Sequence, residues 1–331
     1  GKTPRLWGGL ERLKDEPLTH VPPVGNAIMN AWSRDWVNPH KMLEDGFEII
    51  STPDVWLYIV PAAGYYRDFL DSSWIYNNYR PEMVNGSVTL PNFQEGLIGS
   101  TFAVWNDICE NGISQLDVHY RTMPAVKVVG AKNWKVAPTK TWEEYQAVAN
   151  ISADGPALNL SGVYTNAELN EIASKIAENP INFNGKQEIA LGGTELGYKY
   201  DASFDLKPAR GNKRNAILFQ SRHGVVTLNT GGTGKLGFAR DGYTYTFNYA
   251  PKNRTWQNIR IVGDHKSVAL YIDGKEHETL TAYKKTEGIP RGFMFQQTLV
   301  FPLEKVGDAN NGFKGEIKNL KLSYINKDKA E

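Results

Sequence analysis

Residues 27–51 read AIMNAWSRDWVNPHKMLEDGFEIIS, in which two apolar runs, 27–32 and 47–51, enclose one short helical stretch. That stretch opens with Asn38-Pro39, an N-cap residue followed by a proline suited to the first turn, and Gly46 is placed to stop it. Strand, short helix, strand is the pattern of a parallel sheet. Apolar runs without strict alternation suit strands that are buried on both faces.

Two further apolar runs flank this unit, at residues 4–8 and 97–105. Together the runs predict four parallel strands in chain order, half the number in a (β/α)8 barrel. An open half-barrel leaves two strand edges unpaired. Either another segment closes the sheet, therefore, or the fold is a smaller open α/β sheet, and we favour the second half of a (β/α)8 barrel.

Beyond the fourth run the pattern becomes helical. One helix opens at Gln115, and a second follows Thr141, which forms a capping box with Glu144. The turn Asp154-Gly155-Pro156 marks a domain boundary. We therefore expect three parts: a half-barrel over residues 1–125, a helical connector over 126–155 and an all-β domain over 156–331.

Residues 157–326 read as all-β apart from one helix over 167–178. Residues 243–249 alternate aromatic and polar side chains, so one face of that strand is buried. Asp-Gly pairs at 241–242 and 273–274 predict hairpins. Many short strands joined by turns predict a β-sandwich. The expected strands are 198–206, 216–220, 225–229, 236–240, 243–249, 256–262, 267–272, 292–299 and 315–324.

Bulk properties exclude several function classes. The chain has 331 residues and a formal net charge of +1, which argues against a nucleic-acid or membrane-surface partner. Cys109 is the single cysteine, so the chain can form neither an internal disulfide nor a cysteine-rich metal site. The histidines do not stand at metal-ligand spacings, and no run reaches the roughly 18 apolar residues of a membrane span. We expect no cofactor, no metal and no membrane insertion.

Aromatic residues stand at the ends of the predicted parallel strands. Trp7, Trp32 and Trp105 close the first, second and fourth runs, and Tyr58 follows the third. Active sites of barrels lie at the carboxyl ends of the strands. Aromatic rings there would stack on the apolar faces of sugars, whereas the alternative is ordinary core packing. Asp107 could accept hydrogen bonds from sugar hydroxyls, or cap the element that follows it.

No aspartate–glutamate pair suited to general acid and base catalysis stands at a strand end. The pair Asp15-Glu16 lies beside Pro17 in a polar stretch that we expect to be an exposed loop. Cys109 lies near the expected site, but no base stands beside it, so we expect a small buried hydrophobic residue there.

An ordered set of motifs resembles the glycoside hydrolases of family 20, the β-N-acetylhexosaminidases. The segment closest to the fifth strand of that family is residues 1–9, and Asn30-Ala31-Trp32 resembles the sixth. The seventh and eighth correspond to 46–51 and to Ala103-Val104-Trp105-Asn106-Asp107 with 112–114. Residues 56–61 and 65–70 are similar to the lacto-N-biosidase and streptococcal hexosaminidase branch. The match covers residues 1 to about 125.

The resemblance implies a retaining, substrate-assisted mechanism on terminal N-acetylhexosamine or lacto-N-biose units. The acetamido group of the substrate attacks the anomeric carbon, a glutamate protonates the leaving oxygen, and the preceding aspartate orients the acetamido group. By the same resemblance this Asp-Glu pair lies upstream of Gly1, in the other half of the barrel, encoded in the same gene or carried by a separate chain. The chain alone is then expected to be inactive.

The resemblance also assigns roles within this chain. Trp7, Trp32 and Trp105 surround the sugar ring and the acetamido methyl group, and Asp107 holds sugar hydroxyls. Tyr58 donates to the acetamido oxygen, although Trp56, two residues earlier, could take its place. The C-terminal region resembles laminin-G or concanavalin-like sandwiches at 256–262 and 268–274.

Three functions are open at this point. The leading one is part of a secreted or cell-surface hexosaminidase or lacto-N-biosidase that acts on glycans. The second is a non-catalytic carbohydrate-binding protein, in which the same aromatic residues serve recognition. The third is an adhesion module in which only the β-sandwich acts.

Overall fold

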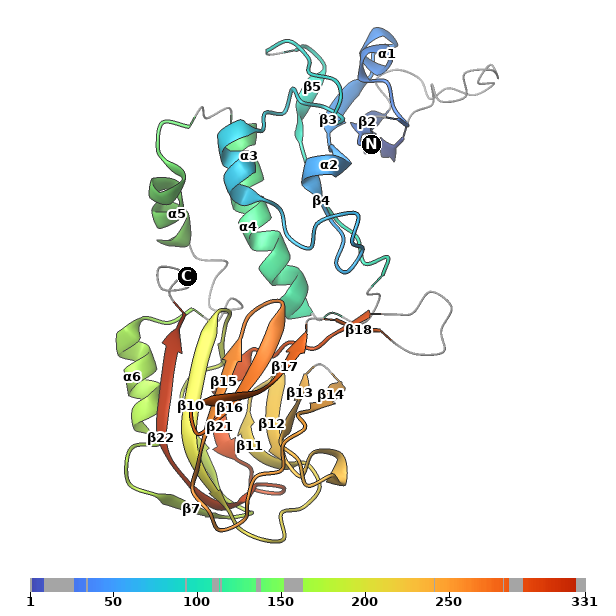
Figure 1. Cartoon of the computed structure of the whole chain (residues 1–331). Helices are drawn as coiled ribbons and strands as arrows, with labels where there is room; N and C mark the ends of the chain where they lie inside the picture. The colour runs from blue at the N-terminus through green and yellow to red at the C-terminus, as the bar shows by residue number, and fades with distance from the viewer. Residues whose placement is uncertain are drawn as a thin grey trace. The chain divides into compact units, whose positions relative to one another are not determined.

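In the computed structural model the described residues are 2–8, 27–33, 35–92, 94–108, 113, 115–134, 138–151, 163–240, 242–281, 283–285 and 294–325. The chain divides into two compact units, each described by itself (Figure 1). Unit 1 comprises Gly1–Asn111 and Val118–Ala153, and unit 2 comprises Gly112–Asp117 and Asp154–Glu331. Within the described ranges, every helix is too short or too polar to span a lipid bilayer.

Unit 1 contains a four-stranded parallel sheet whose spatial order follows the chain. The strands are β1 (Arg5–Trp7), β2 (Ile28–Ala31), β3 (Glu48–Ser51) and β5 (Leu97–Ser100). The prediction of four parallel strands in chain order is therefore confirmed. The closed barrel stays a prediction, because among the described residues β1 and β5 are the edges of the sheet.

The short helix between β2 and β3 begins and ends as its sequence predicts. Helix α1 spans Pro39–Glu44, and the backbone N–H of Lys41 donates to the Asn38 side chain at 3.1 Å. Gly46 follows with φ +85°, a left-handed conformation that glycine adopts without strain. The N-cap and the glycine stop thus fix the length of the crossover.

The fourth predicted strand, 97–105, is in fact two strands. β5 ends at Ser100, and β6 (Ala103–Val104) pairs instead with β4 (Tyr58–Ile59) in a separate parallel pair. The cause lies in β3, which ends at Ser51 and therefore offers residues 103–104 no strand to pair with. Pro53 lacks an N–H, and α2 (Asp54–Leu57) begins directly after it. Trp105 therefore follows β6, and its backbone N–H donates to the Ile59 carbonyl at 2.9 Å.

Three helices accompany the sheet of unit 1: α3 (Ser72–Asn78), α4 (Gln115–Asn133), which enters unit 1 at Val118, and α5 (Trp142–Ile151). Hydrogen bonds attach two of them to the sheet: after α3 the Tyr79 hydroxyl meets the Ser51 hydroxyl at 2.9 Å, and at the end of α4 Asn133 bonds Ser100 at 2.7–2.8 Å. The capping box of Thr141 and Glu144 at α5 is confirmed. The domain end expected at residue 125 falls inside α4.

Unit 2 is a sandwich of two six-stranded antiparallel sheets, which confirms the β-sandwich prediction (Figure 1). One sheet has the order β17 (Lys275–Thr281), β16 (Ser267–Ile272), β15 (Gln257–Gly263), β10 (Tyr200–Pro208), β22 (Lys314–Tyr324), β7 (Ile181–Asn184). The other has the order β14 (Tyr243–Thr246), β13 (Gly237–Arg240), β12 (Gly224–Leu228), β11 (Ala216–Gln220), β21 (Lys305–Gly307), β8 (Glu188–Ala190).

Smaller elements accompany the two sheets. Helix α6 begins at a capping box of Thr165 and Glu168, the helix predicted over 167–178. The Asp273-Gly274 hairpin is confirmed, with both residues at positive φ, whereas Asp241 lies outside the described residues. The smaller elements are α6 (Asn166–Ser174), β9 (Glu195–Leu196), β18 (Tyr283–Lys285), β19 (Met294–Gln296), β20 (Phe301–Pro302) and the 3₁₀ turn η3 (Thr230–Gly232).

The core of unit 2 lies between the two sheets. Alternate residues of β10 point inward, and Phe204 is fully buried. Its ring meets that of Phe219 on β11 at 4.9 Å between centroids, and Phe219 in turn meets Phe301 at 5.0 Å. Each buried ring contributes roughly 1.5–3 kcal/mol by leaving water. Phe219 therefore joins the two layers.

We expect Phe219→Ala to lower the free energy of unfolding of unit 2 by about 3–5 kcal/mol, because the cavity loses contacts on both sheets. Denaturant unfolding followed by circular dichroism measures this change. Lys321→Ala, at an exposed position of β22, is the matched control and should change stability by less than about 0.5 kcal/mol. Equal effects of the two substitutions would contradict this description of the core.

Candidate functional site

Four aromatic residues of unit 1 lie at the ends of its parallel strands. Trp7 is the last residue of β1, Trp32 directly follows β2, Tyr58 opens β4 and Trp105 follows β6. Trp7 and Trp32 lie at the carboxyl ends of neighbouring strands of the four-stranded sheet, Tyr58 and Trp105 flank the separate pair β4–β6, and ring contacts bring the four together. We call Trp7, Trp32, Tyr58 and Trp105 the aromatic cluster.

Tyr58 is the centre of the aromatic cluster. The Tyr58 ring centroid lies 6.4 Å from that of Trp7 and 6.0 Å from that of Trp105. The Trp32 ring is stacked on it at 6.2 Å with an interplanar angle of 6°. Trp7 and Trp105 also meet edge to face at 5.6 Å. The structure thus brings together all four aromatic residues predicted from the sequence.

Exposure differs sharply within the aromatic cluster. The Tyr58 side chain is 6% exposed, whereas Trp7 is 47% and Trp105 37% exposed. A tryptophan that only fills a core is mostly buried. The indoles therefore form a partly open wall around a buried phenol.

The Tyr58 hydroxyl is placed as a hydrogen-bond donor. The nearby Trp105 side chain lowers the pKa of Tyr58, opposing burial, and because an indole N–H can only donate, it does not take up the Tyr58 proton. Burial and the nearby charge of Asp54 raise the pKa of Tyr58 above its usual value. The phenol therefore stays protonated at neutral pH.

A second tyrosine, which was not predicted from the sequence, also lies at this site. The Tyr66 hydroxyl donates to the Asp54 carboxylate at 2.8 Å, and its ring lies 5.4 Å from that of Tyr58. Burial, followed by this hydrogen bond to Asp54, raises the pKa of Tyr66 to about 12. The adjacent aromatics Tyr65-Tyr66 in the loop after β4 were the available signal.

Asp107 lies in the turn after β6, where its side chain is exposed. Its charge acts on Tyr66 and contributes to the raised pKa of that tyrosine. Asp107 therefore stands within electrostatic reach of the aromatic cluster, with a carboxylate open to solvent.

Trp56, the alternative to Tyr58, takes no part in the aromatic cluster. Its ring is stacked on that of Trp74 at 5.2 Å and approaches Tyr79 at 6.3 Å, so it packs against α3. Of the two candidates, only Tyr58 faces the indoles of Trp7 and Trp105.

The chemistry available at this site is recognition. It offers aromatic walls, one buried hydroxyl donor, and the carboxylates of Asp54 and Asp107. Among the described residues no group of three or more His, Cys, Asp or Glu side chains could hold a metal ion. Asp15-Glu16 and Cys109 lie outside the described residues.

Comparison with known proteins gives no family. No protein-family model matches the chain, and neither does any curated protein. Among solved structures, it is similar to domain 4 of AbnA, an extracellular arabinanase from Geobacillus stearothermophilus in complex with arabinotriose. That similarity has 20% identity over 43% of this chain and 68% of the other, with a TM-score of 0.31.

Two further structures show a likeness of the same order. One is the CBM40 of a Ruminococcus gnavus sialidase bound to α2,6 sialyllactose, at 15% identity over 46% of this chain and 94% of the other, with a TM-score of 0.30. The other is the Caenorhabditis elegans galectin LEC-6, at 10% identity over 44% and 96%, with a TM-score of 0.26. Likeness at this level assigns neither a family nor a ligand to this chain.

The pKa of Tyr66 gives a test of the site geometry. Asp54→Asn removes the acceptor charge, so the pKa of Tyr66 should fall from about 12 towards the usual value near 10. Absorbance titration of tyrosinate measures this, with Tyr66→Phe identifying the signal of that residue. The pKa of Tyr66 is higher in the folded chain than in the unfolded chain, so protonated Tyr66 makes its full contribution to folding stability below about pH 10. That contribution is lost as the pH rises to about 12. An unchanged titration in Asp54→Asn would contradict the hydrogen bond.

Proposed function

We propose that the chain binds carbohydrate and that the aromatic cluster of unit 1 is its sugar site. The observation that carries this proposal is the convergence of four aromatic rings around one hydroxyl whose proton is available. Pyranose rings present apolar C–H faces that pack on indoles, and their polar groups need fixed partners. Core packing alone does not account for the exposure of Trp7 and Trp105.

The arrangement suits a 2-acetamido sugar. An acetamido group has an apolar methyl and a carbonyl oxygen within a few ångströms of each other. The indole walls match the methyl group, and the Tyr58 O–H matches the carbonyl oxygen. Asp107, exposed after β6, is available to accept from ring hydroxyls, a charge-assisted contact. We therefore assign an N-acetylhexosamine, alone or as the terminal unit of a glycan, as the ligand.

In its more specific form, the proposal is that the aromatic cluster forms the sugar-binding side of a substrate-assisted hexosaminidase site that acts outside the cell. Hydrolysis requires an acid at the leaving oxygen. Asp54 does not supply it, because its carboxylate accepts from Tyr66, and Asp107 is assigned here to the ring hydroxyls. The Asp-Glu pair implied by the family resemblance would then come from a segment outside residues 1–331.

The edges of the parallel sheet support such a partner segment. Among the described residues, the outer edges of β1 and β5 have no strand beside them. Both edge strands carry apolar side chains in contact with solvent, since Trp7 is 47% and Ile98 49% exposed. Unpaired edges with apolar side chains are where further strands add. Without that segment, sugar binding without hydrolysis is the activity expected of this chain.

Binding of N-acetylglucosamine is the first test, measured by calorimetry on the full chain. Trp105→Ala should weaken binding by about tenfold, because it removes a stacking wall beside Tyr58. Tyr58→Phe should weaken the binding of N-acetylglucosamine by roughly threefold to tenfold. The binding of glucose, which lacks the acetamido group, should be unchanged. Trp134→Ala, at an indole that is 85% exposed, is the matched control. Equal affinity in all variants would overturn the site.

The hydrolytic form of the proposal has a separate test. The chain alone should give no turnover of an aryl N-acetyl-β-glucosaminide, because no acid reaches the leaving oxygen. Release of the aryl group, followed by absorbance, is the measurement. Robust hydrolysis by the purified chain would show that the acid lies within residues 1–331, while leaving sugar binding in place.

A further inference from the structure

Connections between strands at one end of unit 2 carry a marked excess of positive charge. Six connections meet there, where β7, β10, β12, β14, β16 and β21 end (Figure 1). We call them together the basic end, and they are 185–187, 209–215, 229–236, 247–256, 273–274 and 308–313. They hold seven lysines and arginines against two aspartates. The cations are Lys186, Arg210, Lys213, Arg214, Lys235, Lys252 and Arg254.

Asparagine side chains tie the connections together. The Asn311 amide donates to the Asn215 carbonyl at 2.8 Å, and Asn229 donates to the Asn212 carbonyl at 3.1 Å. The backbone N–H of Arg254 donates to the Pro208 carbonyl at 2.7 Å. The loops that carry the charges are therefore held against one another, and the cations project from a fixed frame.

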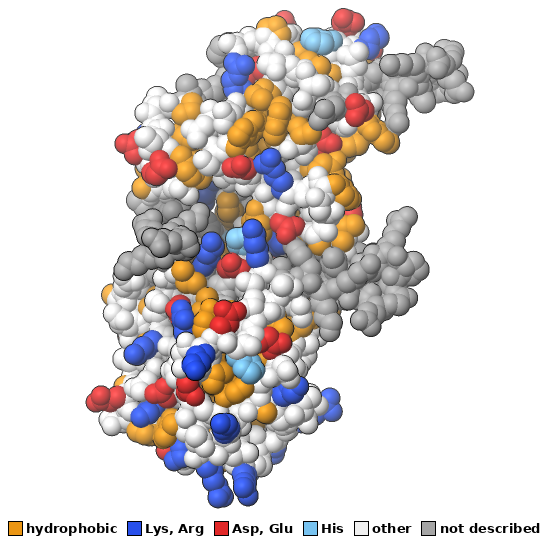
Figure 2. Space-filling view, viewed as in Figure 1, with side chains coloured by type: hydrophobic (Ala, Val, Ile, Leu, Met, Phe, Trp, Pro, Cys, Tyr) orange, Lys and Arg blue, Asp and Glu red, His pale blue; other side chains and the backbone are white. Residues whose placement is uncertain are grey.

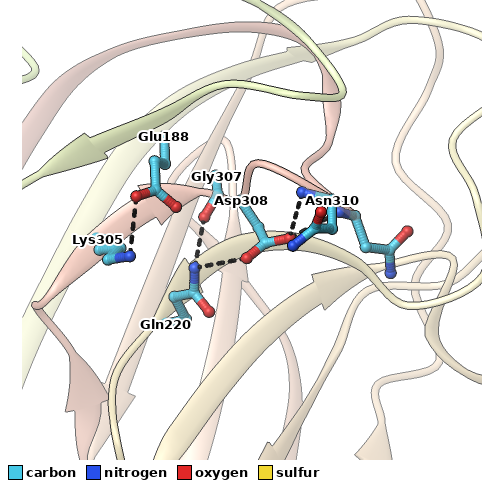
Figure 3. Close-up of polar contacts among 7 residues, drawn as sticks. Glu188, Gln220, Lys305, Gly307, Asp308 and Asn310 are labelled. Atoms are coloured by element: carbon cyan, nitrogen blue, oxygen red, sulfur yellow. Dashed lines mark hydrogen bonds and ion pairs between the residues drawn. The ribbon is translucent and has the colours of Figure 1, made fainter.

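The nearby acidic groups are occupied elsewhere. The Asp308 carboxylate accepts from the backbone N–H groups of Asn310 and Asn311 at 2.8 and 2.7 Å and from Gln220 at 3.2 Å (Figure 3). Glu188, next to the connection 185–187, is bound to Lys305 at 2.9 Å (Figure 3). Asp273, the other aspartate of the connections, accepts from the backbone N–H of Asn258 at 2.8 Å, and in the described part of the chain no ion pair joins any of these three acids to a loop cation.

The loop cations face solvent. Lys235 bonds the Asn248 side chain, and the other six are exposed and form no ion pair within the described ranges of the chain. Figure 2 shows lysine and arginine side chains gathered over this end of unit 2. Since the whole chain has a net charge of only +1, the positive electrostatic potential of the basic end is local.

An aromatic ring borders the basic end. Trp256 immediately precedes β15, and its half-buried ring lies on the outer face of the sheet beside β10 and β22. The Lys318 ammonium lies 4.9 Å from the ring centroid, and that of Lys207 lies 5.7 Å away. Lys207 is also paired with Glu316 at 2.8 Å, whereas Lys318 forms no ion pair with a described residue. An aromatic ring in contact with two lysine ammonium groups thus stands beside the basic end.

We propose that the basic end and Trp256 form a second binding site, for an anionic polysaccharide that carries sulfate or carboxylate groups. The cations match its negative groups, and the Trp256 ring matches the apolar face of one sugar ring. This site is separate from the aromatic cluster of unit 1 and deepens the proposed function by naming a charged glycan as a ligand of unit 2.

The shape of the basic end favours a polysaccharide over a nucleic acid. Duplex DNA is read by a helix or a β-ribbon that enters a groove, and the basic end consists of short loops and the three-residue turn η3. Single strands need successive aromatic platforms, and Trp256 is the only tryptophan in the six connections. Of the other aromatic residues in these connections, Phe247 and Phe313 are fully buried, and the half-buried Tyr249 ring packs edge to face against His277.

The test uses the full chain and immobilised heparin oligosaccharide, with hyaluronan, which carries carboxylates without sulfate, as a second probe. Binding is measured at ionic strengths from about 0.05 to about 0.3 M, and affinity should fall steeply across that range. The triple variant Arg210→Glu, Lys213→Glu, Arg254→Glu should lose at least about tenfold in heparin affinity. Trp256→Ala should lose several-fold in affinity while keeping the salt dependence.

A matched control reverses three other exposed charges of unit 2, Lys175→Glu, Arg222→Glu and Lys266→Glu, none of which lies in the six connections. The heparin affinity of this control should stay within about twofold of that of the parent chain. The same holds for Trp7→Ala, which disables the site in unit 1. If the chain binds both hyaluronan and heparin, carboxylate groups are sufficient for recognition. If it binds heparin alone, sulfate groups are required.

Three results would overturn the proposal: no heparin binding at low salt, equal loss in the control triple variant, or single-stranded DNA of matched charge bound as tightly as heparin. Loss of N-acetylglucosamine binding in Trp7→Ala with heparin binding intact separates a failure at one site from a failure at the other.

Discussion

Parallel pairing of β1, β2 and β3 is the constraint on which the site in unit 1 depends. Trp7 lies opposite Asn30, and Ala31 lies opposite Ser51, so the three strands end at one edge. A shift by one residue would turn Trp7 to the other face of the sheet. Arg5 adds a side-chain bond to the buried Asn30 at 2.8 Å, which ties the edge strand to its neighbour. Whatever the aromatic cluster binds, this register positions its walls.

The break in the fourth predicted strand positions one side of the aromatic cluster. Because β3 gives way to α2 after Pro53, residues 103–104 pair with β4, and Tyr58 lies opposite Ala103. That pairing places the Trp105 ring 6.0 Å from the ring of Tyr58. A straight strand over 97–105 would leave the indole without this partner. The same local environment, buried and close to Asp54, keeps both Tyr58 and Tyr66 protonated.

Strand order, helix caps and the proximity of the four aromatic residues could be predicted because each leaves a local signal: an apolar run, Asn38 before Pro39, an indole at a run's end. The short strands β7, β8 and β21 could not, since three or four residues such as Lys305–Gly307 show no periodicity. The Tyr66–Asp54 bond depends on a loop path that propensity does not encode. The basic end combines six segments spread over residues 185–313, so a scan for charged runs misses it.

Saturation-transfer NMR on the full chain with N-acetylglucosamine tests the central claim most directly, because it reports which ligand protons touch the protein. The account predicts the strongest saturation at the acetamido methyl protons, which the indoles surround, and loss of that signal in Trp105→Ala but not in Trp134→Ala. No transfer to the sugar, or equal transfer in the parent chain and Trp105→Ala, would contradict it.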